Sequence, residues 1–177
     1  MYDLALIAPR KDHELRALAF VQEHLMQDEG NIHGSGGLRF AESYDAWLEK
    51  LRNDLDPDKL TEGRVVGTTY FAVRERDGEI VGTLNLRHEL NAKLLEIGGH
   101  IGYGVRPSER GKGYATQMLK LALLICRDLG IERVLVTCDQ GNDASRRVIV
   151  KNGGAHENDA VEESGTVVER YWIELRQ

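Results

Sequence analysis

The sequence predicts an α/β fold that combines antiparallel strands with a parallel strand-helix-strand unit. Two strand-like segments, residues 68–74 and 80–88, flank an Asp-Gly dipeptide at 77–78, which is typical of a short β-hairpin. Further along, an amphipathic helix joins two apolar segments, residues 97–105 and 133–138. A helix of this length between two strands is typical of a right-handed parallel crossover.

The first elements are a strand over residues 4–8, stopped by Pro9, and a helix over residues 12–29. We expect Asp12 to cap this helix and Gly30 to end it. Its inward face is predicted from a stripe at helical spacing: Leu15, Leu18, Ala19, Gln22, Leu25 and Met26.

A glycine-rich loop follows over residues 30–41 and is expected to be mobile. It is either a plain connector or a substrate-contacting segment, in which His33 or Ser35 would touch the substrate. Ser43 is placed to cap a second helix, with Trp47 as a core anchor, and the Asp-Pro dipeptide at 56–57 ends it.

The strand over 97–105 carries four glycines, which predict a bulge or a close approach of a ligand to the backbone. The following helix should stop at Gly130. Asn142 begins a further helix that ends at 152–154, and an alternating segment over 167–175 predicts a terminal strand.

Length and charge limit the choice of function. The chain has 177 residues, 41% hydrophobic and 29% charged, which fits a single domain over 1–177. Its formal net charge of −6, without clusters of Lys and Arg, argues against nucleic acid as a partner. An amine or other cationic substrate is mildly favoured.

No segment of the sequence has the character of a targeting or membrane-spanning element. The amino terminus reaches charged residues too soon for a secretory signal, and the longest apolar run, residues 121–126, is too short for a bilayer. We therefore expect a cytoplasmic protein that does not enter membranes. Cys126 and Cys138 both lie in apolar patterns, which does not indicate a disulfide framework.

An anion site is predicted where a strand, a glycine-bearing loop and a helix start follow one another. Gly111 and Gly113 let backbone N–H groups approach a ligand without a Cβ in between. The first turn of a helix leaves its N–H groups unpaired at the positive end of the helix dipole. A phosphate or pyrophosphate is the natural ligand of such a place.

The string around these glycines resembles a family signature. Arg110-x-x-Gly113-x-Ala115 is similar to the acetyl-CoA motif of the GNAT N-acetyltransferase superfamily, Gln/Arg-x-x-Gly-x-Gly/Ala. Asn142-x-x-Ser145, followed by Lys-x-Gly at 151–153, resembles its second motif, with glycine at 154 in place of the usual aromatic residue. The resemblance implies the GNAT fold: a mixed, mostly antiparallel central sheet flanked by helices, with a splayed parallel strand pair at the cofactor site.

The resemblance also implies acetyl-CoA as cosubstrate, without a metal. Pantetheine would lie in the gap of the splayed pair, and the amides after Arg110 would hold the pyrophosphate. Asp139 and Asp143 lack further ligands at metal-binding spacing. The residues expected at the cofactor are Gly104, Val105, Arg110, Gly111, Lys112, Gly113, Tyr114, Ala115, Thr116, Asn142 and Ser145. Asn142 is equally explained as a helix N-cap, and the side chains of Arg110, Lys112 and Thr116 as solvated groups at a loop and helix start.

Two positions at which the family often carries its general base and general acid hold Gly99 and Ile149 instead. Tyr103 is the preferred substitute acid, because it shares a strand face with Val105. The other candidates for acid-base chemistry are Glu96, His100 and Tyr171, while Cys138 is either a nucleophile or a small buried hydrophobe.

The resemblance therefore implies an N-acetyltransferase that acts on a primary amine by direct attack in a ternary complex. The missing acid and base leave open a GNAT-fold acyl-CoA binding or sensing protein without turnover, and the loop alone leaves open a nucleotide-binding module. Polyamine, amino acid, antibiotic and protein amino terminus are alternative acceptors. A homodimer is the commonest assembly to expect.

Overall fold

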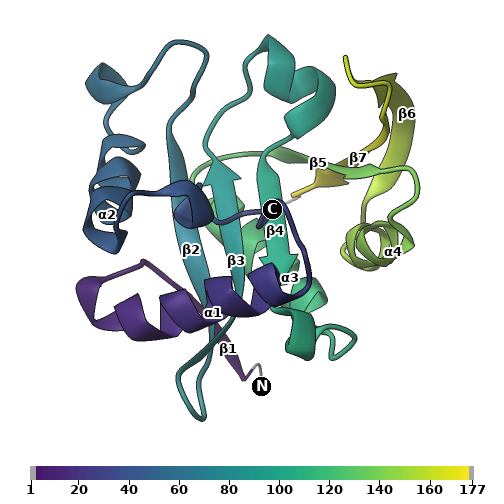
Figure 1. Cartoon of the computed structure of the whole chain (residues 1–177). Coiled ribbons are helices and arrows are strands. Elements are labelled where there is room, and N and C mark those ends of the chain that lie inside the picture. The colour runs from purple at the N-terminus through teal and green to yellow at the C-terminus, as the bar shows by residue number, and fades with distance from the viewer. Residues whose placement is uncertain (1–2, 176–177) are drawn as a thin grey trace.

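The computed structural model describes residues 3–175 and contains two antiparallel sheets (Figure 1). One has four strands in the order β1-β2-β3-β4, and the other three in the order β5-β7-β6. The strands are β1 (Leu4–Ile7), β2 (Gly67–Arg74), β3 (Glu79–Arg87), β4 (Ile101–Val105), β5 (Arg133–Asp139), β6 (Ala155–Val161) and β7 (Val167–Glu174). The α-helices are α1 (Glu14–Met26), α2 (Tyr44–Asn53), α3 (Tyr114–Asp128) and α4 (Asp143–Lys151).

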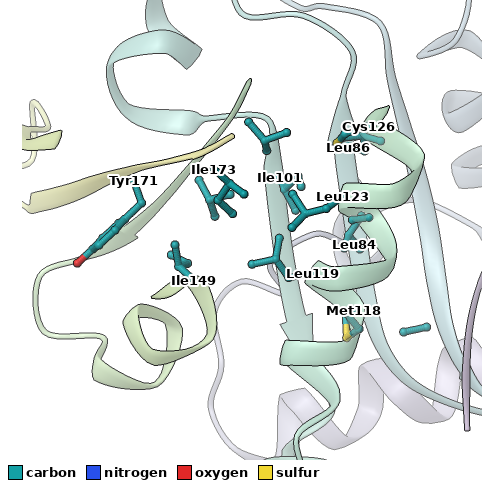
Figure 2. Close-up of a cluster of buried hydrophobic side chains, with 14 of the residues drawn as sticks. Leu84, Leu86, Ile101, Met118, Leu119, Leu123, Cys126, Ile149, Tyr171 and Ile173 are labelled. Atoms are coloured by element: carbon teal, nitrogen blue, oxygen red, sulfur yellow. The ribbon is translucent and has the colours of Figure 1, made fainter. Parts of the chain in front are cut away.

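The helices cover the four-stranded sheet from both sides. In Figure 1, α1 and α2 lie in front of it and α3 lies behind it. The α1–α2 side has a core around Phe20, Trp47 and Phe71. The α3 side has a larger core that also reaches the three-stranded sheet; Figure 2 shows Leu84 and Ile101 of the first sheet, Met118 and Leu119 of α3, and Ile149 and Ile173 beyond them.

Most predicted elements are confirmed, including the hairpin of β2 and β3 and the helix that ends before Gly130. The strand predicted over 97–105 is shorter than expected. Residues Leu94–Gly98 form a π-helical turn, and Gly99 leaves it with φ +63°, a left-handed conformation that favours glycine. Strand β4 therefore starts only at Ile101.

The prediction for the buried face of α1 was wrong. The structure buries Ala17, Phe20 and His24, whereas Leu15 is 82% exposed and Met26 is 72% exposed. Asp12 does not cap this helix, whose N-cap residue is His13, and the helix ends at Met26 rather than near Gly30.

Strand β3 is irregular at its start. A register shift between Ala72 and Val73 of β2 places Ile80 on the α1–α2 side and Val81 in the core on the α3 side. Such bulges add a residue to one strand and reverse the faces beyond it. From Thr83 onward the residues alternate regularly, with Leu84 and Leu86 facing α3.

Candidate active site

The two sheets meet at His100. Its backbone N–H donates to the carbonyl of Leu135 at 2.8 Å, and its imidazole Nδ1 accepts from the Leu135 N–H at 2.9 Å. Beyond this point β4 and β5 belong to separate sheets and form no ladder in the part of the chain described. Burial lowers the pKa of His100 to about 4, so the ring is neutral and able to accept. Strands β4 and β5 thus diverge from His100 and leave an opening between them.

Strand β4 directs every second backbone group into this opening. The Arg106 N–H donates to Val81 and the Arg87 N–H to the carbonyl of His100, so even-numbered residues near β4 bond to β3. The amides of Tyr103 and Val105 consequently point to the opposite edge. Of the two strand residues expected at the cofactor, Val105 offers an amide there, while Gly104 pairs with Thr83 of β3.

The glycine turn before α3 has the form of an anion site. Gly111 and Gly113 have φ of +77° and +85°, and a Cβ on either would meet no atom within 4 Å. The first intrahelical donor is the Gln117 N–H, which reaches the Gly113 carbonyl at 3.2 Å. Within residues 3–175, no acceptor is found for the amides of 111–116. Such a turn fits a pyrophosphate.

Carboxylates of α1 and the residues just after it hold the chain that leads into this turn. The guanidinium of Arg110 donates to Glu29 at 2.5 and 2.8 Å and to the Val105 carbonyl at 3.1 Å. Glu23 accepts from Arg106 at 2.5 Å and from the Ser108 N–H at 2.7 Å. The Arg110 side chain is therefore engaged within the protein, where it holds the path of the loop.

The remaining residues at the start of α3 are also placed by contacts within the fold. Lys112 donates to Glu109 at 2.9 Å. Tyr114 is buried, and its hydroxyl lies 3.4 Å from Arg74. Asn152, the residue after α4, donates its side-chain amide to the Thr116 carbonyl at 3.3 Å. Ala115 completes this first turn. The open donors of the turn are thus its backbone amides.

A pair of hydroxyls bridges the opening. Tyr103 of β4 lies 2.7 Å from Ser145 of α4, oxygen to oxygen. Burial raises the pKa of Tyr103 to about 12, so the phenol keeps its proton at neutral pH. The structure therefore brings together one predicted catalytic residue and one predicted cofactor residue. Asn142 is the N-cap of α4, since its Oδ1 accepts from the Ser145 N–H at 3.0 Å.

The two positions without an acid or base are explained by packing. Ile149 is fully buried in the core that Figure 2 shows. A Cβ on Gly154 would lie 2.4 Å from the Ile149 Cγ2, so glycine at 154 makes room for this isoleucine. Gly99 is buried with a left-handed backbone, and a Cβ there would meet the Leu135 carbonyl at 2.6 Å. A carboxylate does not fit at Gly99.

The other acid-base candidates lie elsewhere or are engaged. Glu96 is exposed in the turn before β4. The imidazole of His100 holds β5, as described above. Tyr171 donates its hydroxyl to Glu169 at 2.8 Å, and Figure 2 shows this hydroxyl pointing away from the apolar cluster.

A buried polar cluster at the end of β5 was missed by the sequence reasoning. The carboxylate of Glu169 accepts from Arg146 at 2.7 and 2.8 Å, and the Cys138 thiol lies 3.8 Å from it. Burial raises the pKa of Cys138 to about 11, which keeps the thiol protonated and does not favour a nucleophile. The apolar pattern of the terminal strand gave no signal for Glu169, because a carboxylate counts as polar in such a pattern.

The glycine-rich loop over 30–41 crosses in front of β3 and β4 (Figure 1). The His33 carbonyl accepts from Thr83 at 3.0 Å, and a Cβ on Gly104 would lie 2.7 Å from the same carbonyl. Glycine at 104 is thus needed for the approach of this loop. His33 itself is exposed beside β4, whereas Ser35 is buried and its carbonyl accepts from Trp47.

Two negative findings concern residues 3–175 alone. No three or more His, Cys, Asp or Glu side chains gather there in a way that could hold a metal ion. None of the helices in this range combines the length and apolar character that a membrane span needs.

Comparison with known proteins places these features in a family. The profile described as "Acetyltransferase (GNAT) domain" matches residues 4–155. No curated protein sequence matches significantly. Solved structures of similar fold include the ribosomal-protein-S5-alanine acetyltransferase from Vibrio fischeri, at 12% identity and a TM-score of 0.73 over 98% of this chain and 94% of that one.

Two further structures are similar over nearly the whole chain. Mutant forms of the spermidine/spermine N-acetyltransferase from Vibrio cholerae share 17% identity at a TM-score of 0.67, with 97% of this chain and 94% of that chain covered. A ribosomal L7/L12 alpha-N-protein acetyltransferase in complex with coenzyme A shares 17% identity at a TM-score of 0.68, over 97% and 93%. The family profile covers most of the sequence, and these structures have the same fold: the chain belongs to the GNAT acetyltransferase family, whose acyl donor is acetyl-CoA.

Proposed function

We propose that this protein is an N-acetyltransferase that transfers the acetyl group of acetyl-CoA to a primary amine of a small molecule or peptide by direct attack in a ternary complex. The observation that carries the proposal is the position of two sets of donors. The open amides at the start of α3 lie beyond the end of β4, and the Tyr103–Ser145 hydroxyl pair lies in the opening between β4 and β5. One set suits a pyrophosphate and the other a reacting thioester.

The chain offers backbone amides for most of the cofactor. The amides of Gly111 to Thr116 would bind the pyrophosphate, and the Val105 amide would face the pantetheine arm. Asn142 keeps its carboxamide N–H₂ for the arm while its oxygen caps α4. Acetyl-CoA would supply the thioester and the acceptor the amine, while the groups that bind them would belong to this chain.

The chemistry requires a neutral amine and a stabilised carbonyl oxygen. The amine nitrogen forms a bond to the acyl carbon as the carbon-sulfur bond breaks, and the proton of the amine passes to water. The edge amides of Tyr103 and Val105 are the donors for the carbonyl oxygen. The Tyr103 phenol, hydrogen-bonded to Ser145, holds the proton that the departing sulfur receives.

The acceptor is an amine on either a small molecule or a peptide. Proteins of similar fold are named for ribosomal-protein amino groups and for spermidine. Both cysteines are free and buried, which suits the reducing cytoplasm, where we place the enzyme. A homodimer remains our expectation for its assembly.

The test is thiol release from acetyl-CoA in the presence of an amine panel that contains polyamines, amino acids and peptides. Thiol release that depends on one acceptor class, with the acetylated amine found by mass spectrometry, supports the proposal. Binding of acetyl-CoA without turnover of any amine would instead support the sensing protein. A melting temperature raised by ATP and not by acetyl-CoA would favour a nucleotide-binding module.

A further inference from the structure

Arg87, at the end of β3, is a partly buried arginine whose known contacts are all with neutral groups. Its Nη1 donates to the carbonyls of Gly98 and Gly99, both at 3.0 Å. These two bonds use part of a guanidinium that has five N–H donors. The side chain lies on the face of the sheet that the 30–41 loop covers, since a Cβ on Gly102 would be 3.8 Å from its Nη2.

No carboxylate lies within ion-pair distance of Arg87 among residues 3–175. Other partly buried arginines of this fold, such as Arg74, Arg106 and Arg146, are each paired with acidic side chains. Burial lowers the pKa of Arg87, and the charge of Arg64 lowers it further. A cation that is partly withdrawn from water without a counter-charge is costly, and an anionic ligand offsets that cost.

A second donor faces the same place. The Gly34 nitrogen would lie 3.9 Å from a Cβ on Gly102, and within the described chain its N–H has no acceptor. Gly102 is one residue before Tyr103 and three before Val105, whose edge amides belong to the proposed acyl site, so it lies within about 10 Å of that site along the strand. Arg87 and the Gly34 amide therefore flank a point only a few carbon-carbon bonds from the proposed acyl site.

We infer that Arg87, with the Gly34 amide, binds an anionic group of the acceptor, so that the preferred substrate is an amine that also carries a carboxylate or phosphate. This inference rests on the proposed function and narrows its acceptor class. A guanidinium binds either anion through paired N–H groups, and a polyamine offers nothing for it to bind. Arg87 is thus a specificity-determining residue that takes no part in proton transfer.

The test compares amines that differ only in the anion. β-Alanine against propylamine reports on a carboxylate, and O-phosphoethanolamine against ethanolamine reports on a phosphate. We expect kcat/KM for at least one anionic amine to exceed that of its neutral partner about tenfold or more. The difference should come from a lower KM for the anionic amine, with kcat similar for both. Arg87→Gln should remove this preference and leave the neutral amine unchanged, and Arg127→Gln, which alters an exposed arginine of α3, should preserve it.

Gly102→Ala provides a second variant in case Arg87→Gln disturbs the turn at 98–99. Its methyl group meets only ordinary contacts, yet it stands between the two donors. It should weaken the anionic amine selectively. An equal effect of either variant on both amines of a pair, or a wild-type enzyme that prefers the neutral amine in both pairs, would overturn the inference.

Equilibrium binding separates this inference from the proposed function. Calorimetric titration of both amines of each pair, the anionic and the neutral one, into the protein with coenzyme A needs no turnover. If no amine is acetylated, the proposed function fails, and anion binding that is lost in Arg87→Gln still supports the subsite. Equal affinity for anionic and neutral amines in this titration contradicts the subsite even if turnover is observed.

Discussion

The carboxylate of Glu29 accepts two hydrogen bonds from Arg110, at 2.5 and 2.8 Å, and thereby joins the end of α1 to the turn that precedes α3. The same carboxylate lies 2.6 Å from Nδ1 of the buried His24. Glu29 is thus fixed from both sides, and the nearby Arg110 keeps the pKa of this carboxyl at about 2. The first helix, which contributes nothing directly to the glycine turn, consequently sets its position.

We expect Glu29→Gln to weaken acetyl-CoA binding about twofold to fivefold, because partly exposed ion pairs contribute up to about 1 kcal/mol. Isothermal titration with acetyl-CoA measures the effect. Asp45→Asn is a matched control, since it removes an exposed ion pair with Lys11 that lies away from the turn. Equal losses in both variants would show that Glu29 does not act through Arg110.

Gly113→Val should reduce acetyl-CoA affinity at least tenfold with the fold retained. The valine side chain would project into the open space at the turn, and the left-handed backbone adds a strain of roughly 1–2 kcal/mol. Gly165→Val is the control for strain, because Gly165 has φ +87° and equally open surroundings in the hairpin of β6 and β7. Unchanged acetyl-CoA affinity in a folded Gly113→Val protein would remove the basis of the site.

Tyr103→Phe should lower kcat while leaving the affinity for acetyl-CoA near its original value, since only the hydroxyl is lost. Ser145→Ala should have a similar effect through the loss of the 2.7 Å contact. Tyr70→Phe, in the same core but away from the opening, is the control. Full kcat for Tyr103→Phe with a good acceptor would make Tyr103 a structural residue and leave the proton to water.

The rate should rise with pH through the neutral range. An alkyl amine with a pKa near 10.4 is almost wholly protonated at pH 7, so its deprotonation limits attack. Tyr103, with a pKa raised to about 12, stays protonated over the same range and adds no descending limb. A profile of kcat/KM from pH 6 to about 9.5 tests this expectation, and a fall above pH 8 without loss of structure would contradict it.

The free energy of unfolding should decrease as the pH falls below 6.5, because His100 is neutral in the folded protein. The pKa of His100 is depressed to about 4 in the folded protein, so the unfolded chain takes up a proton first as the pH falls from about 6.5 towards 4. The free energy of unfolding is therefore lower below pH 4 than above pH 6.5, by on the order of 3 kcal/mol from His100 alone. Urea unfolding at pH 7 and 4.5 should show a smaller pH effect in His100→Asn, whose amide oxygen can accept from Leu135 without titrating. An equal pH effect in both proteins would exclude His100 as the cause.

The glycine-rich segment over 30–41 remains the expected acceptor side, with His33 exposed beside β4. We expect its amides to exchange more slowly with deuterium when an acceptor that the enzyme can acetylate binds in the presence of coenzyme A. Coenzyme A alone should leave this segment unchanged. No response to an acceptor that is demonstrably acetylated would show that the segment is only a connector.

The order of elements and the glycine turn were readable from the sequence because they depend on local signals. The Asp-Gly hairpin, the Ser43 cap and the left-handed glycines each act within a few residues of themselves. The face of α1 was not readable, because two apolar stripes compete on this helix. The stripe with Phe20 is buried because it meets Trp47 and Phe71 of other elements, and its His24 counts as polar in any pattern.

Both members of the hydroxyl pair, Tyr103 and Ser145, were predicted as site residues, but their contact was not. Tyr103 was selected for its strand face and Ser145 for its motif, but their contact depends on how far α4 lies from β4, which no spacing specifies. The contact of His100 was not predicted either. Its ring accepts a hydrogen bond from the Leu135 N–H of β5, where a neighbouring strand would normally supply a backbone carbonyl. Side chains that join segments far apart in sequence were therefore the part of the site that the sequence reasoning did not reach.

The hydrogen bonds between His100 and Leu135 connect two sheets whose strands come from separate stretches of the chain, and this has a consequence for how the chain acquires its structure. Strands β1 to β4 come from residues 4–105 and pair strictly with their neighbours in sequence, while β5 to β7 come from residues 133–174. Each sheet takes all of its strands from one continuous stretch of the chain, so neither ladder needs a strand of the other sheet. The amino-terminal sheet can assemble on the ribosome before the last strands are synthesised. The proposed acyl-transfer site between the two units would then be completed only when the second one docks.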